Sequence, residues 1–303
     1  MVPQMTGISV LTIVRNREAH LMQLLEGLRR SDRQPDEVII VDMGDEPLTS
    51  GEMPFPVVVD RMDGRGLPLA KARNRAAELA RQDLLLFLDV DCIPLRACVG
   101  GMREALRAVQ GVVCAEVRYL GPNDARGAWC EGDLMIQGLP HPVRSFPETG
   151  MREEGNPGLF WSLAFGVHAK RFRDMGGFDE TFVGYGAEDT DFGFRAAAAG
   201  VPLFFLGGAI VCHQHHDSHE PPVQHLADIV RNANVFKRRW NRWPMEGWLQ
   251  AFHEMGLVDW TPDRLDLRRA PTAQECAASL TTWPGSLARH SGDRAELRGV
   301  SPA

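Results

Sequence analysis

Apolar residues in the first third of the chain fall into short continuous runs, separated by segments with helical spacing. Four runs have the length and composition of strands: residues 8–14, 37–42, 57–59 and 84–88. Two intervening segments, 19–30 and 70–81, carry their apolar residues on one helical face. This β-α-β-β-α-β order with short connections predicts an α/β domain whose sheet is mostly parallel and flanked by helices.

The chain between residues 96 and 211 predicts further elements around one long connection. We expect helices at 96–109, 168–175 and 188–199, strands at 112–119 and 203–206, and a short apolar run at 209–211. Residues 121–158 are rich in Gly, Pro and charge, which predicts a long excursion with mobile parts, often a lid or an insertion. Regular structure is expected again at residues 159–167.

The pattern changes from Pro222 onward. Apolar residues at helical spacing predict one long helix over residues 223–240. Trp240, Trp243 and Trp248 are expected to pack this helix onto the main domain, with sugar stacking as the alternative. After Trp260 the sequence is polar, with scattered Pro, Gly and Arg, and predicts a tail that is poorly ordered or wraps over the surface.

These patterns divide the chain into three parts. Residues 1–220 are predicted to form one α/β domain, with a nucleotide-binding half (1–115) and an acceptor-binding half (116–220). Residues 221–260 form a helical extension packed on that domain, and residues 261–303 form the polar tail.

Composition and charge narrow the class of protein. The hydrophobic content of 44% is ordinary for a globular domain, and the net charge of -7 argues against non-specific nucleic-acid binding. The six cysteines form no C-x-x-C pair, which indicates reduced thiols instead of a disulfide framework or a zinc site. Neither a leader peptide nor a membrane-spanning stretch is visible, so we expect a cytoplasmic protein, with peripheral membrane contact left open.

Two carboxylates follow directly after the apolar run 84–88. Asp89 and Asp91 flank a single residue, and Pro94 ends the segment. Ligands of open α/β sheets bind at the carboxyl ends of the strands, and carboxylate oxygens suit Mg²⁺ or Mn²⁺ that bridges a diphosphate. Solvated acids at a strand end are the simpler alternative, because D-x-D is a short pattern.

Other polar residues follow the neighbouring predicted strands. Arg15 comes after the first strand and Asp42 ends the second, while Lys71, Arg73 and Asn74 open the helix 70–81. Helix amides and basic side chains both favour a phosphate. Taken singly, Asp42 could cap a helix and Arg73 could lie on a solvated helix face. Their shared position at one sheet edge predicts a common nucleotide site.

A second group of acids begins the predicted helix 188–199. Glycines frame the preceding loop from Gly176 to Gly186, which allows the backbone to approach a ligand closely. Glu188, Asp189 and Asp191 then open the helix, where acids also stabilise the helix dipole. A carboxylate beside a substrate cleft can act as a general base.

Four histidines lie within residues 213–219. The run lacks the closed Cys and His set of a zinc site, and a surface loop is one alternative. One imidazole that joins Asp91 on a Mn²⁺ ion fits the pattern better, because imidazole is an acceptable ligand for that metal.

Together these motifs resemble the family 2 glycosyltransferases, which have the Rossmann-like GT-A fold. The resemblance runs from Ile8 to Trp248, and the second half resembles the galactosyltransferase carboxyl-terminal module. Its motifs are the D-x-D pair, the segments 177–180 (GFDE) and 184–189 (GYGAED), and the segment 211–214 (VCHQ). The long match over 177–189 is more specific than D-x-D.

The resemblance implies roles for residues on the donor side. Asp42 would contact the nucleobase and Arg73 the nucleotide, while Asp89 would bind the ribose or support the metal. Asp91 would ligate the metal, and His213 would complete that site, with His216 as the alternative ligand. Met43 and Gly44 depart from the family pattern, because relatives often carry a second polar residue after the aspartate.

The resemblance also implies the reaction. Asp189 would be the general base and Glu188 would hold acceptor hydroxyls. We therefore expect a metal-dependent, inverting glycosyltransferase that uses Mn²⁺ or Mg²⁺ and a nucleotide-diphospho-sugar, with UDP as the expected nucleotide. The acceptor is left open among glycan, peptide, lipid-linked and small-molecule hydroxyls. Trp129, Phe160 and Trp161 are candidate stacking surfaces, with core packing equally open.

Two rival functions share some of these features. A sugar nucleotidyltransferase would carry a glycine-rich phosphate loop after the first strand, where this chain has Val14-Arg15-Asn16-Arg17. A non-catalytic sugar-nucleotide-binding module has no need for both a metal pair and a base candidate.

Overall fold

The computed structural model describes residues 6–63 and 65–281, and its first half follows the predicted order of elements. The strands are β1 (Ile8–Val14), β2 (Glu37–Asp42), β3 (Val57–Arg61) and β4 (Leu84–Leu88), and the helices are α1 (Glu18–Arg29) and α2 (Leu69–Leu79). β1 pairs in parallel with β2 and β4, and β2 pairs in parallel with β3. The carboxyl ends of these strands therefore meet at one edge of the sheet.

The second half completes a ten-stranded sheet, in which eight strands follow the order β3-β2-β1-β4-β9-β6-β10-β5, β7 pairs with β6 and β8 pairs with β10. Its strands are β5 (Cys92–Pro94), β6 (Val112–Tyr119), β7 (Leu139–Pro140), β8 (Met151–Glu154), β9 (Ala164–His168) and β10 (Leu203–His213). Its helices are α3 (Cys98–Ala108), α4 (Glu131–Gln137), the 3₁₀ turn η1 (Pro157–Leu159), α5 (Ala169–Asp174) and α6 (Glu188–Ala198). β9 runs antiparallel to β4 and β6, so parallel pairing is continuous only over β3-β2-β1-β4.

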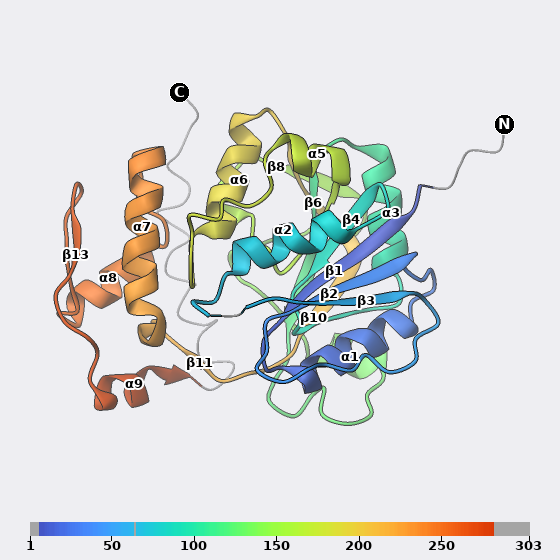
Figure 1. Cartoon of the computed structure of the whole chain (residues 1–303), viewed down its shortest axis with the longest axis horizontal. Helices are drawn as coiled ribbons and strands as arrows, with labels where there is room; N and C mark the ends of the chain where they lie inside the picture. The colour runs from blue at the N-terminus through green and yellow to red at the C-terminus, as the bar shows by residue number, and fades with distance from the viewer. Residues whose placement is uncertain (1–5, 64, 282–303) are drawn as a thin grey trace.

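Helices lie on both sides of this sheet (Figure 1). Leu21, Leu24 and Leu28 of α1 share one apolar core with Val99 and Met102 of α3. The opposite face is covered by α2, α5 and α6, which contribute Ala76, Phe172 and Phe192 to a second core. The prediction of an α/β fold with a central sheet flanked by helices is confirmed.

Two local predictions need correction. The apolar runs 203–206 and 209–211 belong to one strand, β10, with a register shift between Leu206 and Ile210. Gly207 and Gly208 interrupt the apolar pattern there: a Cβ on Gly207 would lie 2.1 Å from the Pro147 carbonyl oxygen, and Gly208 has φ of +80°. The long connection 121–158 contains α4, β7 and β8 as short elements.

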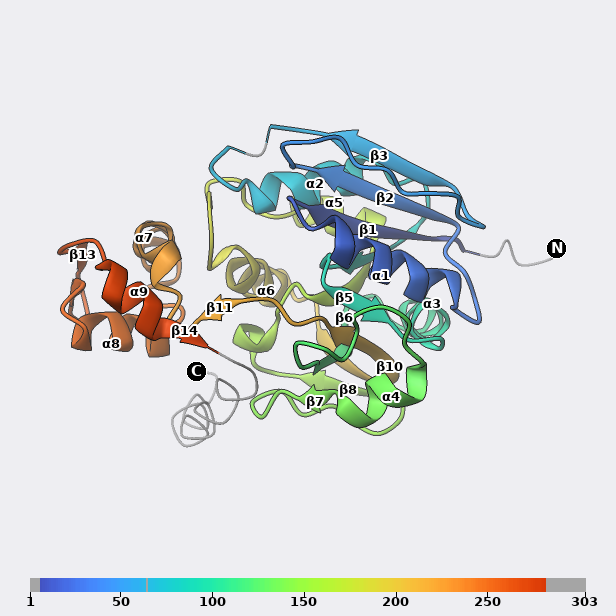
Figure 2. The ribbon, with the colours of Figure 1, turned by 90° about the horizontal axis from the view of Figure 1, so that it is seen from below.

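The C-terminal part is helical and lies beside the α/β domain (Figure 2). Its elements are β11 (Ser218–His219), the 3₁₀ turn η2 (Val223–His225), α7 (Leu226–Trp240), α8 (Glu246–Glu254), β12 (Val258–Trp260), β13 (Leu265–Leu267), α9 (Ala273–Ser279) and β14 (Leu280–Thr281). Trp240 packs beside Phe182 and Ala187 of the α/β domain, as predicted, whereas Trp243 and Trp248 pack against a buried cluster formed by the helical part itself. No helix in the described ranges is long and apolar enough to cross a membrane.

The predicted polar tail has regular structure where it is described. Residues 265–281 form β13, α9 and β14, and α9 begins with a capping box between Thr272 and Glu275. β14 pairs with β11, which attaches this segment to the chain that follows β10. Poor order therefore does not hold for residues 265–281, and residues 282–303 lie outside the described part.

Candidate active site

Asp89 and Asp91 lie at the carboxyl end of β4, as the sequence predicts. The Asp89 carbonyl oxygen accepts a hydrogen bond from the Cys92 amide over 2.9 Å, which makes a tight turn between β4 and β5. The Asp89 amide donates to the Leu163 carbonyl oxygen over 2.8 Å, just before β9. Asp91 is buried, whereas the Asp89 side chain keeps 24% of its surface exposed. The two carboxylates therefore have different access to a ligand.

The pairing of β10 with β5 places the late histidine beside the acid pair. His213 lies opposite Cys92 in this antiparallel pairing, although 120 residues separate them in the chain. His213 Nε2 lies 3.4 Å from Asp91 Oδ1, and His216 Nε2 lies 3.4 Å from Asp91 Oδ2. The structure therefore brings both histidines to Asp91, where the sequence left one as an alternative.

Asp91, His213 and His216 have the donor set of a divalent-metal site. One ligand atom from each side chain lies within 4.8 Å of the others. A carboxylate with two imidazoles suits Mn²⁺ and related ions. Burial acts to raise the pKa of Asp91, but the His213 and His216 rings and the Arg17 guanidinium outweigh it and hold that pKa well below its ordinary range. Burial lowers the pKa of His213, which favours the neutral imidazole that a metal requires.

Arg73 connects Asp89, which the sequence assigns to the donor, with Glu188, which the sequence assigns to the acceptor. This arginine is only 4% exposed, and its Nη2 lies 3.1 Å from Asp89 Oδ1 while its Nη1 lies 3.1 Å from Glu188 Oε1. Its guanidinium also lies 5.3 Å from the ring centre of Phe178. The alternative of a solvated helix face is therefore wrong for Arg73, whose charge is enclosed between two carboxylates.

The acids around Arg73 have raised pKa values. Burial raises the pKa of Asp89 to about 6, with Arg73 opposing and Asp91 adding to the shift. Burial, with the negative charge of Asp189, raises the pKa of Glu188 to about 7. Burial also raises the pKa of Asp189, against the opposing effects of Arg73 and of backbone amides at Thr190 and Ser162. Carboxylates tuned in this way are common where proton transfer occurs.

Glu188 and Asp189 are presented by an unusual entry into α6. Ala187, the residue before the helix, has the left-handed φ of +71°, and Gly184 and Gly186 before it also have positive φ. The Thr190 amide donates to Asp189 Oδ1 over 2.7 Å, which orients this carboxylate at the first turn. The acids therefore lie at a helix start, but the loop conformation that precedes them determines where they point.

Helix α7 fixes the loop that precedes α6 through hydrogen bonds to its backbone. The buried Asn232 side-chain amide donates to the carbonyl oxygens of Val183 (3.1 Å), Tyr185 (3.3 Å) and Gly186 (2.9 Å). Gly184 packs against Asp228 so closely that a Cβ there would lie 2.2 Å from the Asp228 carboxylate. The C-terminal helical part therefore supports the segment that carries Glu188 and Asp189.

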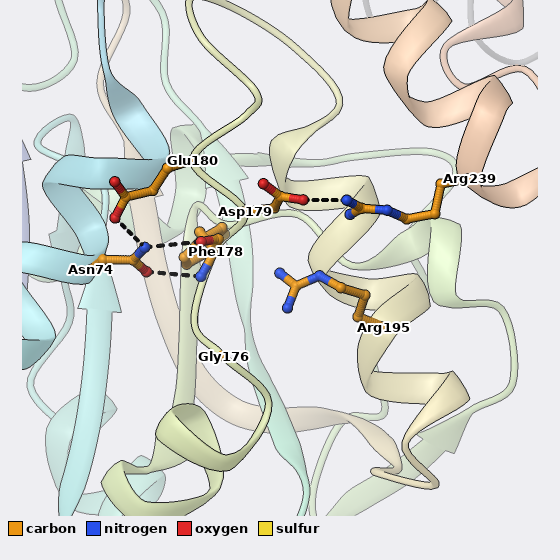
Figure 3. Close-up of a pocket in the computed structure, with 7 residues that line it drawn as sticks. All are labelled: Asn74, Gly176, Phe178, Asp179, Glu180, Arg195 and Arg239. Carbon is orange, nitrogen blue, oxygen red and sulfur yellow. Dashed lines mark hydrogen bonds and ion pairs between the residues drawn. The ribbon is translucent and has the colours of Figure 1, made fainter.

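Asp191, the third acid of α6, is enclosed by side chains of the protein itself. It is fully buried, and its carboxylate pairs with Arg195 and Arg239 at 2.7 Å each and accepts a hydrogen bond from Trp240 Nε1. Figure 3 shows Arg239 reaching from α7 to Asp179, beside Arg195 of α6. A surface cavity of about 410 Å³ lies here, lined by Asn74, Gly176, Phe178, Asp179, Glu180, Arg195 and Arg239. None of the acids around Arg73 and none of the Asp91 cluster lines it.

The remaining predicted donor-side residues differ in their surroundings. Asp42 is buried, with Oδ1 accepting from the Gly44 amide (2.8 Å) and Oδ2 lying 3.3 Å from Arg61 Nε. Arg15 and Lys71 are exposed. The Asn74 side chain bonds both the amide and the carbonyl oxygen of Phe178, so it fixes the loop 176–180 in place.

A row of neighbouring rings runs from His213 of the candidate metal centre to Trp161. The sequence indicated Trp161 as a stacking candidate but not Tyr119 or His141. The rings of Tyr119 and His213 lie 5.1 Å apart, those of Tyr119 and His141 5.9 Å, and those of His141 and Trp161 4.6 Å. Trp161 precedes Ser162, whose backbone amide bonds Asp189. Of the three predicted stacking candidates, Trp129 and Phe160 pack in the interior, and Trp161 is partly exposed on this row.

A mixed α/β sheet with flanking helices and acids at its carboxyl edge defines a GT-A type of protein. Comparison with known families agrees: the profile described as "Glycosyl transferase family 2" matches residues 9–182. This match covers more than half of the chain, and the chain belongs to glycosyl transferase family 2. Glu188, Asp189 and His213 lie beyond the matched segment.

The curated relatives include a glucosyltransferase and a polysaccharide synthase by name. Validoxylamine A glucosyltransferase of Streptomyces hygroscopicus subsp. limoneus is 30% identical over 273 residues, which cover 77% of this chain and 56% of the relative. Hyaluronan synthase of Pasteurella multocida is 25% identical over 253 residues, covering 72% of this chain and 25% of that protein. The chain thus spans about half of the first relative and a quarter of the second.

Solved structures share the fold at low sequence identity. GalNAc-T7, solved with UDP, GalNAc and Mn²⁺, has a TM-score of 0.54 at 17% identity, covering 69% of this chain and 43% of that one. Residues 1–349 of S. aureus TarS give a TM-score of 0.51 at 15% identity, covering 76% and 65%. These similarities confirm the GT-A fold.

Proposed function

We propose that this chain transfers a sugar from a nucleotide-diphospho-sugar to an acceptor hydroxyl, with a divalent metal and with inversion at the anomeric carbon. The observation that carries this proposal is the Arg73 bridge, which joins Asp89 of the donor side to Glu188 of the acceptor side at 3.1 Å each. Acids that the sequence assigns to two substrates thus form one buried cluster. A module that binds only a sugar nucleotide has no use for the second group of acids.

On the donor side, the chain offers groups for a base, a ribose and a diphosphate. Asp42 Oδ2 is buried and pairs with Arg61 Nε at 3.3 Å, but it accepts no hydrogen bond from the described residues, and we propose that it accepts one from a nucleobase N–H. The partly exposed Asp89 suits ribose hydroxyls. Asp91, His213 and His216 would hold Mn²⁺ or Mg²⁺, which supplies Lewis-acid stabilisation of the leaving diphosphate when bound. The solved relative with UDP and Mn²⁺ supports UDP and manganese as the first choices.

On the acceptor side, Asp189 is the proposed general base. Its raised pKa gives it more proton affinity than an ordinary aspartate, and the Thr190 amide fixes its orientation. Asp189 removes the hydroxyl proton as the acceptor oxygen attacks the anomeric carbon and the diphosphate departs. A single displacement of this kind inverts the anomeric configuration. Glu188 is proposed to accept a hydrogen bond from another acceptor hydroxyl.

The names of the relatives support a hydroxyl acceptor of the saccharide or small-molecule type. One relative is named for glucosyl transfer to validoxylamine A and another for the synthesis of hyaluronan. The aromatic row formed by Tyr119, His141 and Trp161 runs from His213 to the residue before Ser162, and such rings suit a sugar-like acceptor.

Two measurements test the proposal. A thermal-shift panel of UDP-, GDP- and dTDP-sugars, each with and without Mn²⁺, should give the largest increase in melting temperature for the true donor with metal. The anomeric configuration of the transfer or hydrolysis product should then be inverted relative to that donor. A product with retained configuration would remove Asp189 from the base role, and pyrophosphate release from a nucleoside triphosphate and a sugar phosphate would indicate a nucleotidyltransferase instead.

A further inference from the structure

Asp91 has a third partner besides the two histidines. Arg17 Nη1 lies 2.7 Å from Asp91 Oδ2, the same oxygen that lies 3.4 Å from His216 Nε2. Arg17 is the residue before α1, in the segment that follows β1. Its side chain is 37% exposed, whereas that of Asp91 is 7% exposed. A partly exposed cation therefore neutralises the buried carboxylate of the candidate metal centre.

This cation and a metal ion would compete for one oxygen. A divalent ion such as Mg²⁺ binds carboxylate oxygens at about 2.1 Å, and two cations at that range on one oxygen repel each other strongly. An ion held by Asp91 Oδ2 and His216 therefore requires the guanidinium of Arg17 to move. Arg17 can do so, because its side chain is long, partly exposed and attached outside the regular part of α1.

We propose that Arg17 is a counter-cation that occupies Asp91 until metal and donor bind, and that it then transfers to the diphosphate. The proposal rests on the metal centre under "Proposed function" and deepens it. Guanidinium groups bind phosphate oxygens in a bidentate manner, and the diphosphate of a metal-bound donor lies next to the metal. Arg17 is a positioning and binding residue in this scheme: it weakens the binding of metal alone and strengthens the binding of metal with nucleotide.

The scheme makes metal and nucleotide binding cooperative. A bound diphosphate gives the displaced Arg17 a new ion-pair partner, so the nucleotide raises the affinity for the metal. By linkage, the metal raises the affinity for the nucleotide by the same factor. Loss of Arg17 should change the two affinities in opposite directions. A residue that only shapes the loop would change both in the same direction.

The experiment measures the binding of Mn²⁺ alone by the electron paramagnetic resonance signal of the free ion. The proteins are the full chain and its variants Arg17→Gln, Arg17→Lys, Arg15→Gln and Asp91→Asn, each with its melting temperature recorded. Arg15 is exposed and carries the same charge two residues earlier, so in the measurement of Mn²⁺ alone its variant controls for the general loss of positive charge. A second measurement gives the dissociation constant of UDP at saturating Mn²⁺ by equilibrium dialysis, together with GDP and dTDP.

Arg17→Gln should bind Mn²⁺ alone about fivefold or more tightly than the wild type, and should bind its preferred nucleoside diphosphate about fivefold more weakly. Arg17→Lys keeps a cation and should lie between the two, which maintains the test if the glutamine variant folds poorly. Unchanged or weaker Mn²⁺ binding in folded Arg17→Gln overturns the proposal, as does equal tightening in Arg15→Gln. If the wild type binds Mn²⁺ neither alone nor with UDP, and folded Arg17→Gln does not bind it either, the metal centre itself fails, and this inference fails with it.

Discussion

The Asn232 side-chain amide donates a hydrogen bond to the carbonyl oxygen of Gly186 over 2.9 Å, from a helix outside the family-matched segment to the loop that precedes Asp189. The same amide bonds two further carbonyl oxygens of this loop, and Asn232 is completely buried. Glu188 and Asp189 therefore depend for their position on a helix that follows them by some forty residues in the chain (Leu226–Trp240).

Replacing Asn232 by alanine should reduce both stability and turnover. Three carbonyl oxygens of the loop lose a buried donor, at a cost of about 1–3 kcal/mol in the free energy of unfolding. Because the loop determines where the Asp189 carboxylate lies, we expect kcat to fall at least about tenfold while the nucleotide dissociation constant stays within twofold. Asn234→Ala is the matched control: Asn234 lies on the same helix and donates to the Leu265 carbonyl oxygen instead. An equal loss of kcat in both variants would contradict a specific role for Asn232.

Gly184→Ala should destabilise the protein more than Gly200→Ala. Both glycines have positive φ, +78° and +67°, so both alanines carry backbone strain of about 1 kcal/mol. At Gly184 the new Cβ would also lie 2.2 Å from the Asp228 carboxylate, whereas at Gly200 no other atom of the described residues lies within 4 Å of it. Urea unfolding gives the two free energies of unfolding, and equal losses would show that Asp228 moves aside easily.

Asp189→Asn should abolish transfer without weakening nucleotide binding. The amide cannot accept the acceptor proton, and general-base catalysis contributes about 10²- to 10⁴-fold in rate. The variant keeps the size of the side chain, and Asp189 lies on the acceptor side of Arg73. We therefore expect kcat to fall by that factor while the melting-temperature increase with nucleotide and Mn²⁺ matches that of the wild type. A parallel loss of nucleotide binding would place Asp189 in the donor site.

Arg73→Met should reduce stability sharply, and more so at higher pH. Removing the cation leaves the buried Glu188 and the partly exposed Asp89 without their partner, and loss of one member of a buried ion pair costs about 3–5 kcal/mol. Arg75→Met is the control, because Arg75 is on the same helix but forms an ion pair at the surface with Asp60. An equal effect in the two variants would show that the Arg73 bridge is not special.

The pH dependence of this stability has a definite sign. The pKa values of Asp89 and Glu188 are raised to about 6 and about 7 in the folded chain, above their ordinary values of 3.8 and 4.5. The folded state therefore holds more protons than the unfolded state in this range, and the contribution of these groups to the free energy of unfolding decreases as pH rises from about 4 to about 7. In Arg73→Met the pKa values rise further, so the decrease should be steeper and extend to higher pH. Urea unfolding at several pH values between 5 and 8 tests this.

The position of Asp42, Asp89 and Asp91 at one sheet edge could be predicted because its signals are local. A continuous apolar run places Asp89 and Asp91 at a strand end, and the Rossmann-like order of elements brings Asp42 to the same edge. The strand β9 enters antiparallel beside β4, and this could not be predicted because pairing partners leave no mark on a short apolar run. The β10 bulge was missed for a related reason, since two glycines resemble a strand boundary.

For the proposed acceptor side, the sequence predicted which residues to consider but not which side chains surround them. The motif 177–189 identified Glu188 and Asp189, but their neighbours come from distant segments. Arg73 lies 115 residues before Glu188, and its burial between two acids depends on how α2 packs against α6. Likewise, the helical spacing of α7 predicts its apolar face but gives no sign that the polar Asn232 is buried against the loop. Such roles arise from tertiary packing.

The register of β10 has a consequence for folding. His213 reaches Asp91 only after β10 has paired with β6 on one side and β5 on the other, and β10 is formed by residues far downstream of the D-x-D motif. A one-residue slip of that strand would turn His213 to the opposite face of the sheet. Tight binding of a divalent ion at this centre would therefore report that the last central strand has docked correctly, and manganese could serve as a probe for the completion of folding.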